Sequence, residues 1–242
     1  MSERDQIFSE ELERISGFSF DDRVAQVFPD MINRSVPGYK AIVAMTGQLA
    51  GHYAKPGASC YDLGCSRGAS TLAMASNTPD DCKIIAVDNS KAMIDLLQED
   101  LKKSSYRSRV ELHHADILEE KFANSSFTAM NFTLQFVDPA QRDRLIRQIY
   151  TGLNPGGALL LSEKIRFEDV QMDNLMTELY YDYKRTQGYS DLEISQKRSA
   201  LENVLVAETR DTHLERLQRA GFSRAAVWFQ CLNFCSFLAI RA

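Results

Sequence analysis

The sequence predicts an α/β fold built on a doubly wound, mostly parallel seven-stranded sheet, with N-terminal helices and a helical insertion. Strand-like and helix-like runs alternate over residues 59–163, which is the pattern of parallel strands joined by crossover helices. A glycine-marked turn between Gly64 and Gly68 follows a buried strand and opens a helix. Two strand-like runs at the end of the chain predict an antiparallel hairpin that completes the sheet.

The N-terminal part, residues 1–55, is expected to form a helical cap over the edge of the sheet. Apolar residues recur at helical spacing over residues 20–28 and again over residues 39–49. Between them, residues 29–39 contain two prolines and a glycine, which predicts a break in the helix. The aromatic Tyr39 ends this break and is a candidate for contact with a ligand.

The core of the fold is predicted from residues 56–166 and 207–242 within a single domain. Strands are expected in the run that begins at Cys60 and leads into the glycine turn, and at residues 83–88, 110–113, 127–132, 158–161, 225–230 and 233–240. Helix 139–150 turns three apolar side chains inward and should end before the Pro-Gly-Gly sequence at 155–157. A further helix over residues 211–220 is closed by Gly221.

The alternation fails over residues 167–206, where a long polar and helical stretch is inserted. One apolar stripe of this stretch contains Leu175, Met176, Leu179, Tyr180 and Tyr183. The stretch is too long for a connection and too charged for a core. It is therefore expected to form a helical lid or a dimer arm.

Composition limits the classes of protein that the chain can be. Its 242 residues are 44% hydrophobic and 25% charged, which is typical of a globular protein. No apolar run approaches the roughly 18 residues of a membrane span, and the N-terminus has no signal-peptide pattern, so we expect a soluble, cytoplasmic protein. The net charge of −5 argues against direct nucleic-acid binding and favours a small substrate. Five cysteines, an odd number, predict reduced thiols, and no metal site is expected.

The glycine-marked turn predicts a nucleoside pocket. Gly64 can adopt backbone angles that side chains disfavour, and the missing Cβ atoms of Gly64 and Gly68 allow close approach of a ligand and a helix. The second strand ends in Asp88, about 20 residues after the turn, where a carboxylate can accept both ribose hydroxyls.

The identity of the nucleoside is indicated by later strand ends. The turn reads G-x-S-x-G, whereas a dinucleotide site would have G-x-G-x-x-G. Asp116 and Ile117 follow the third strand, and Asn131 lies at the tip of the fourth, which are the adenine-edge and substrate-facing positions of S-adenosylmethionine (SAM) enzymes. This order favours SAM over NAD. An ordinary turn without a ligand would leave Asp88 and Asp116 unexplained. His113 and His114 point to opposite faces of a strand and are not expected to form an acid/base pair.

Several sequence blocks are unusual for methyltransferases in general. They are Val27-Phe28-Pro29-Asp30-Met31, Arg34-Ser35-Val36-Pro37-Gly38-Tyr39, Tyr61-Asp62-Leu63-Gly64-Cys65-Ser66, Asn131-Phe132-Thr133-Leu134-Gln135-Phe136, Leu161-Ser162-Glu163-Lys164, Gly188-Tyr189-Ser190, Leu192-Glu193-Ile194-Ser195-Gln196-Lys197-Arg198 and Trp228-Phe229-Gln230-Cys231. With these blocks the chain resembles the carboxy-S-adenosyl-L-methionine (carboxy-SAM) synthase family over nearly its full length.

This resemblance implies a Rossmann-like SAM-binding fold and a carboxyl transfer from prephenate to the SAM methyl group. The products are carboxy-SAM and phenylpyruvate, and carboxy-SAM serves wobble-uridine modification in tRNA. The implied partners are a second copy of the chain and the tRNA carboxymethyltransferase that uses the product. The tip at Asn131 lacks the Pro-Pro-aromatic clamp that holds a nucleophilic amine in many SAM enzymes, which agrees with this reaction.

The positions that match the family's ligand-binding motifs are Tyr39, Gly64, Cys65, Ser66, Asp88, Asn89, Asp116, Ile117 and Asn131. The resemblance also implies that Arg198 pairs with the added carboxylate from the neighbouring subunit of a homodimer. A guanidinium suits this task because it can form two parallel bonds to a carboxylate. Without the resemblance, Arg198 would be interpreted as a surface helix residue in a weak ion pair.

Two other classes of function remain open. A conventional SAM-dependent methyltransferase acting on a small molecule or tRNA would use the same pocket and release S-adenosylhomocysteine. A noncatalytic SAM-binding dimer would bind SAM without turnover.

Overall fold

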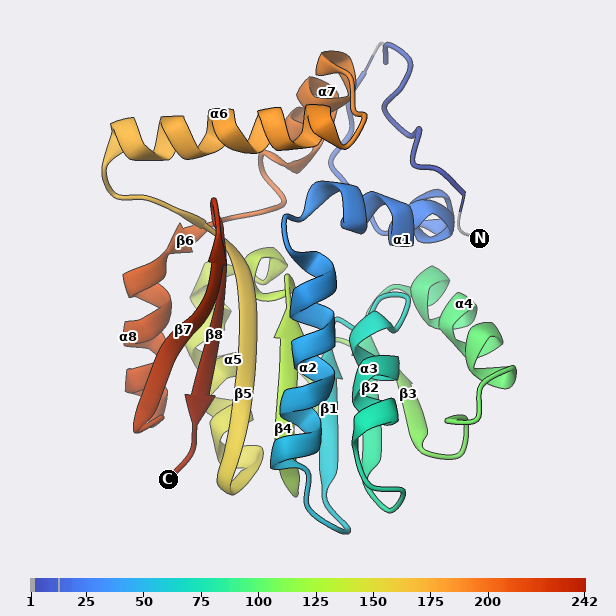
Figure 1. The fold of residues 1–242 in the computed structure, drawn as a ribbon, viewed down its shortest axis with the longest axis vertical. Helices are drawn as coiled ribbons and strands as arrows, with labels where there is room; N and C mark the ends of the chain where they lie inside the picture. The colour runs from blue at the N-terminus through green and yellow to red at the C-terminus, as the bar shows by residue number, and fades with distance from the viewer. Residues whose placement is uncertain (1–2, 13) are drawn as a thin grey trace.

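Seven strands form one continuous sheet in the order β3-β2-β1-β4-β5-β8-β7, and Figure 1 shows them spread across the view with α2 and α3 in front of the sheet. The computed structural model describes residues 3–12 and 14–242. The strands are β1 (Ser59–Leu63), β2 (Lys83–Asp88), β3 (Val110–His114), β4 (Ser125–Asn131), β5 (Leu153–Arg166), β7 (Arg224–Cys231) and β8 (Phe234–Ile240). Strands β1 to β5 pair in parallel, and β8 runs antiparallel to both β5 and β7. The predicted mostly parallel sheet and terminal hairpin are confirmed. A two-residue strand, β6 (Glu208–Thr209), also pairs with β5.

Helices cover both faces of the sheet because its central strands are apolar on both sides. They are α2 (Tyr39–Tyr53), α3 (Ala69–Asn77) and α4 (Lys91–Lys102) on one face and α5 (Pro139–Gly152) and α8 (Arg210–Ala220) on the other. Within β4, Phe127 packs with α2 and α3, whereas Met130 packs with α5. Both side chains are fully buried, as expected for a strand covered on both faces.

The first helix differs from the sequence prediction. Helix α1 (Asp22–Ser35) continues through Pro29, and residues before Asp22 form no helix in the described part of the chain. Asp21 caps this helix by accepting a hydrogen bond from Val24 N at 3.0 Å. The helix also buries Val24, Val27, Phe28 and Met31. This burial offsets the cost of about 3 kcal/mol that a proline imposes inside a helix. The break predicted at residues 29–39 is limited to Val36, Pro37 and Gly38, where Gly38 has φ +77°.

Strand β5 also differs from the prediction, since it begins directly after α5 and includes the Pro-Gly-Gly sequence that was expected to lie in a loop. Gly156 has φ +78° within this stretch, and its N–H donates to the Arg241 carbonyl at 2.9 Å. The backbone is therefore held in the sheet by the C-terminal residues.

The insertion forms two helices, α6 (Val170–Thr186) and α7 (Asp191–Leu201), which lie with α1 above the carboxyl ends of the strands (Figure 1). Ser190 and Glu193 form a capping box at the start of α7. After the insertion the chain returns to the sheet at β6, where Glu208 accepts hydrogen bonds from Arg142 at 2.6 Å and from Arg216 at 2.7 Å. These contacts fix the insertion over the end of the sheet where ligands bind in such folds.

The described residues of the N-terminal segment form neither helix nor strand before α1, and the segment packs on the insertion. The Gln196 side chain of α7 donates hydrogen bonds to the carbonyls of Phe8 at 3.1 Å and Glu10 at 2.8 Å, and it accepts one from Leu12 N at 2.8 Å. The N-terminal segment therefore contacts α7 before the chain enters α1. Over residues 3–12 and 14–242, no helix combines the length and apolar character that crossing a bilayer requires.

Candidate ligand-binding pocket at the carboxyl edge of the sheet

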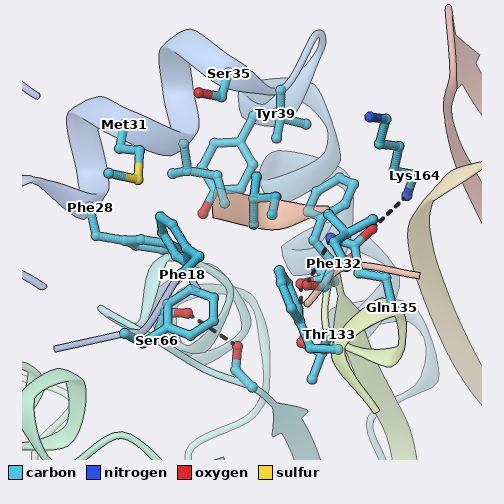
Figure 2. A pocket seen from close by; sticks show the side chains of 18 of the residues that line it. Phe18, Phe28, Met31, Ser35, Tyr39, Ser66, Phe132, Thr133, Gln135 and Lys164 are labelled. Atoms are coloured by element: carbon cyan, nitrogen blue, oxygen red, sulfur yellow. Dashed lines mark hydrogen bonds between the residues drawn. The ribbon is translucent and has the colours of Figure 1, made fainter. Parts of the chain in front are cut away.

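A cavity of about 780 Å³ lies between the carboxyl ends of the strands and the helices above them. Its size suits a small-molecule site. All ten residues predicted for the site line this cavity, namely Tyr39, Gly64, Cys65, Ser66, Asp88, Asn89, Asp116, Ile117, Asn131 and Arg198. Eight of them meet there because they lie at the carboxyl ends of β1 to β4, which share one edge of the sheet, whereas Tyr39 comes from α2 and Arg198 from α7. In Figure 2, Tyr39 points into the cavity from α2, Phe18 and Phe28 lie on one side, and Phe132 and Lys164 lie on the other.

The turn after β1 requires its glycines for contacts within the protein. Gly64 has φ +74°, and a Cβ atom there would lie 2.2 Å from Thr133 Oγ1. Gly68 has φ +76°, and its Cβ would lie 2.4 Å from Leu97 Cδ1 on α4. Between them Ser66 also has a positive φ of 47°, which is strained for a residue with a side chain. The turn is thus held in a conformation that directs backbone groups at the cavity.

Asp88 connects this turn to the end of β2. Its Oδ2 accepts a hydrogen bond from Ser66 N and its Oδ1 accepts one from Ser90 N, each at 2.8 Å. Burial raises the pKa of Asp88 and the two backbone N–H groups oppose that rise. Each carboxylate oxygen keeps a further lone pair, so Asp88 can still accept hydrogen bonds from two ligand hydroxyls.

A second buried carboxylate, Asp62, also lines the cavity and was not predicted as a site residue. It is 2% exposed and accepts a hydrogen bond from Thr71 Oγ1 at 2.6 Å. Burial raises the pKa of Asp62 to about 7, although the Thr71 hydrogen bond lowers it. The signal that could have identified Asp62 is an acidic residue inside an otherwise apolar strand directly before the glycine turn.

The amide of Asn131 is held by hydroxyl groups. Its Nδ2 donates to Thr46 Oγ1 at 3.2 Å and to Ser70 Oγ at 3.0 Å, and its Oδ1 accepts from Ser162 Oγ at 2.7 Å. Both ends of the amide are therefore engaged within the protein. The side chain thereby orients the tip of β4 against α2 and α3, and Asn131 lines the cavity.

The loop after β4 is shaped by Glu163 of β5. This carboxylate is fully buried and accepts hydrogen bonds from three successive backbone N–H groups, those of Thr133, Leu134 and Gln135, at 3.3, 2.9 and 3.0 Å. Burial raises the pKa of Glu163 to about 8, against the effect of the three N–H groups. Phe132, which precedes them, has φ +60° and lines the cavity. Glu163 therefore acts on the cavity by positioning this loop.

The part of the cavity beneath α6 and α7 is aromatic and cationic. Phe132, Tyr180 and Phe234 form one buried cluster whose neighbouring ring centroids are 5.9 and 5.2 Å apart. Lys164 and Lys184 line the same region, together with Arg198. Neither lysine was predicted as a site residue. The only sequence signal is that Lys164 follows an apolar strand and Lys184 follows the apolar stripe of the insertion.

Three titratable groups near the strand ends, His113, His114 and Cys65, are poor candidates for chemistry in the cavity. His113 contacts Glu120 and Glu111, His114 contacts the Asn89 carbonyl, and neither histidine is a lining residue. Burial raises the pKa of the Cys65 thiol, which keeps it protonated. In the described part of the chain, no group of three or more His, Cys, Asp or Glu residues could hold a metal ion.

Comparison with known proteins indicates both the fold and the family. A family model described as a methyltransferase domain matches residues 61–157. A carboxy-SAM synthase of Yersinia enterocolitica is 49% identical over 241 residues, which cover 99% of this chain and 91% of the relative. A carboxy-SAM synthase of Escherichia coli O1:K1 / APEC is 49% identical over 243 residues, which cover 100% of this chain and 98% of the relative.

Solved structures share the fold at low sequence identity. An O-methyltransferase family protein from Burkholderia thailandensis has a TM-score of 0.67 at 16% identity, with 92% of this chain and 60% of that chain covered. Human N-acetylserotonin methyltransferase in complex with SAM has a TM-score of 0.61 at 18% identity, with 91% of this chain and 55% of that chain covered. The predicted Rossmann-like fold is confirmed.

Proposed function

Because this chain belongs to the carboxy-S-adenosyl-L-methionine synthase family, we propose that it transfers a carboxyl group from prephenate to the methyl group of SAM. The products are carboxy-SAM and phenylpyruvate. Carboxy-SAM then passes to a tRNA carboxymethyltransferase that modifies wobble uridine. The proposed place of the reaction is the cytoplasm.

The observation that carries this proposal is the division of the cavity into two chemically different ends. Asp88, Asn89 and Asp116 line the end beside the strand tips, which suits the hydroxyls of a nucleoside. Lys164, Lys184 and Arg198 line the other end. An amine that accepts a methyl group gains nothing from three cationic groups, whereas an anionic co-substrate is bound by them.

The proposed reaction needs no base from the protein. Prephenate loses its ring carboxylate as CO2, and the electron pair of the broken C–C bond makes the ring aromatic and expels hydroxide. Hydroxide removes a proton from the SAM methyl group, which leaves water and a sulfonium ylide. The ylide carbon attacks CO2 to form carboxy-SAM. The protein has to position the two reactants and exclude bulk water.

The proposed assembly is a homodimer in which Arg198 acts in trans on the added carboxylate. Helices α6 and α7 carry much of the exposed apolar surface, with Val170, Met172, Leu175, Leu179 and Leu192 between 40% and 71% exposed. Such a surface is suited to burial against a second copy. The Arg198 side chain is exposed and lines the cavity of its own chain, so action in cis is the alternative that mixing of variants must distinguish.

Isotope labelling tests the reaction. Prephenate labelled with heavy carbon at its ring carboxylate is incubated with SAM, and the products are analysed by mass spectrometry. We expect the label on the former SAM methyl group, since CO2 formed in a closed cavity should react before external bicarbonate enters. Label lost to solvent, or S-adenosylhomocysteine as the main product, would contradict the proposal and favour a conventional methyltransferase.

A further inference from the structure

Three lysines from three elements converge on the cavity beneath the insertion. They are Lys164 of β5, Lys184 of α6 and Lys197 of α7. Lys184 and Lys197 are only 4% and 6% exposed. Burying ammonium groups together costs several kcal/mol for each ion unless anions accompany them.

Among the described residues, Lys197 is the only one of these three lysines with a carboxylate within ion-pair distance. Lys197 Nζ lies 3.6 Å from Asp5 Oδ2 and donates a hydrogen bond to Ser35 Oγ at 3.2 Å. Among residues 3–12 and 14–242, neither Lys164 Nζ nor Lys184 Nζ makes an ion pair or a hydrogen bond. Each instead faces the Tyr180 ring, at 5.2 and 5.4 Å from its centroid.

Contact with Tyr180 does not balance the charges of the buried Lys184 and the half-buried Lys164. A cation–π contact contributes about 2 kcal/mol when it is desolvated, which is less than the cost of burying one ammonium group. Burial, followed by the repulsion of Lys197 and Lys164, lowers the pKa of Lys184 to about 7. Burial also lowers the pKa of Lys164, which Asp173 partly opposes. An anion bound in the cavity would therefore stabilise the charged form of both lysines.

We infer that Lys164 and Lys184 form the subsite that binds the carboxylates of a small dicarboxylate co-substrate bearing a six-membered ring. Their separate positions on β5 and α6 allow each ammonium group to engage its own carboxylate. The aromatic cluster of Phe132, Tyr180 and Phe234 supplies apolar walls for the ring. This inference rests on the proposed function, in which SAM occupies the nucleoside end.

The subsite is distinct from the role proposed for Arg198. Lys164 is fixed by its strand, since its backbone N–H donates to Gln135 Oε1 at 3.0 Å, and Lys184 lies near the end of α6. Arg198, in contrast, is exposed. The two lysines therefore act on the co-substrate before transfer, and Arg198 acts on the product. Substitution of the lysines should weaken co-substrate binding without weakening nucleoside binding.

Binding measurements without turnover test the subsite. S-adenosylhomocysteine has no transferable methyl group, so the protein is saturated with it and then titrated with prephenate by calorimetry. Lys164→Met and Lys184→Met keep side-chain length and remove the charge, whereas Lys184→Arg keeps the charge. Lys103→Met serves as the matched control, because Lys103 is exposed after α4 and outside the cavity.

We expect each methionine variant at the subsite to bind prephenate at least tenfold more weakly, with S-adenosylhomocysteine affinity within twofold of wild type. Lys184→Arg should lose less prephenate affinity than Lys184→Met does, and Lys103→Met should bind prephenate as wild type does. Phenylpyruvate, which has one carboxylate, should bind wild type at least tenfold more weakly than prephenate does.

Three results would overturn the inference. They are wild-type protein that does not bind prephenate, methionine variants that bind it as wild type does, and methionine variants that lose nucleoside affinity to the same extent. The proposed function is judged separately by product mass. If the variants lose prephenate binding as expected but wild type forms no carboxy-SAM, the subsite stands and the proposed reaction fails.

Discussion

Replacing Asp88 with asparagine should weaken SAM binding and also destabilise the turn that forms the pocket. The two oxygens of this carboxylate each accept a backbone N–H, from Ser66 and from Ser90, at 2.8 Å. An asparagine side chain presents NH2 in place of one oxygen, so one of these N–H groups loses its acceptor. An unsatisfied buried N–H costs about 1–3 kcal/mol, and each charge-assisted bond lost to the ribose costs about 1.5–3 kcal/mol.

The expected result is a SAM dissociation constant raised at least tenfold, which corresponds to about 1.4 kcal/mol, and a free energy of unfolding lowered by about 1–3 kcal/mol. Calorimetry measures the first quantity and urea denaturation the second. Asp95→Asn is the control, because Asp95 is exposed on α4 and its surface pair with Lys91 contributes at most about 1 kcal/mol. If Asp88→Asn binds SAM within twofold of wild type, Asp88 does not hold the ligand and the assignment of the nucleoside end is wrong.

Two further predictions concern charge and assembly. Because burial raises the pKa of Asp62 to about 7, the side chain is neutral below that pH and ionised above it, so affinity for cationic SAM should rise as pH increases through 7. The same raised pKa makes the ligand-free fold less stable as pH rises from about 4 to 7, because the unfolded chain loses the Asp62 proton at lower pH than the folded chain does. Asp62→Asn should remove most of the pH dependence of SAM affinity, measured by calorimetry, and of the free energy of unfolding, measured by denaturation. Mixing an Arg198→Ala chain with an Asp88→Ala chain should restore one intact site per mixed dimer, measured as recovered carboxy-SAM formation. Mixed dimers that form and stay inactive would instead place Arg198 in cis.

Local sequence patterns determined the sheet and the nucleoside end of the cavity. Strand-like runs, the turn from Gly64 to Gly68 and the acids Asp88 and Asp116 are recognisable within short windows. Since the carboxyl ends of parallel strands share one edge, predicting the strands was sufficient to predict that these residues would meet. All ten predicted residues do line one cavity. Proline propensity misled the prediction at Pro29, where burial of a helical face against α4 outweighs the local cost.

The cationic end of the cavity was decided only by the tertiary structure. Lys164 and Lys184 look like ordinary surface lysines in the sequence. The structure buries Lys184 and half-buries Lys164 because α6 and α7 fold back over the sheet. Asp62 is likewise significant only once its strand is covered on both faces. Backbone periodicity and turn chemistry act over a few residues, so the sequence itself determines them. The electrostatic cost of a charge depends on which distant segments exclude water around it, and only the folded chain determines that.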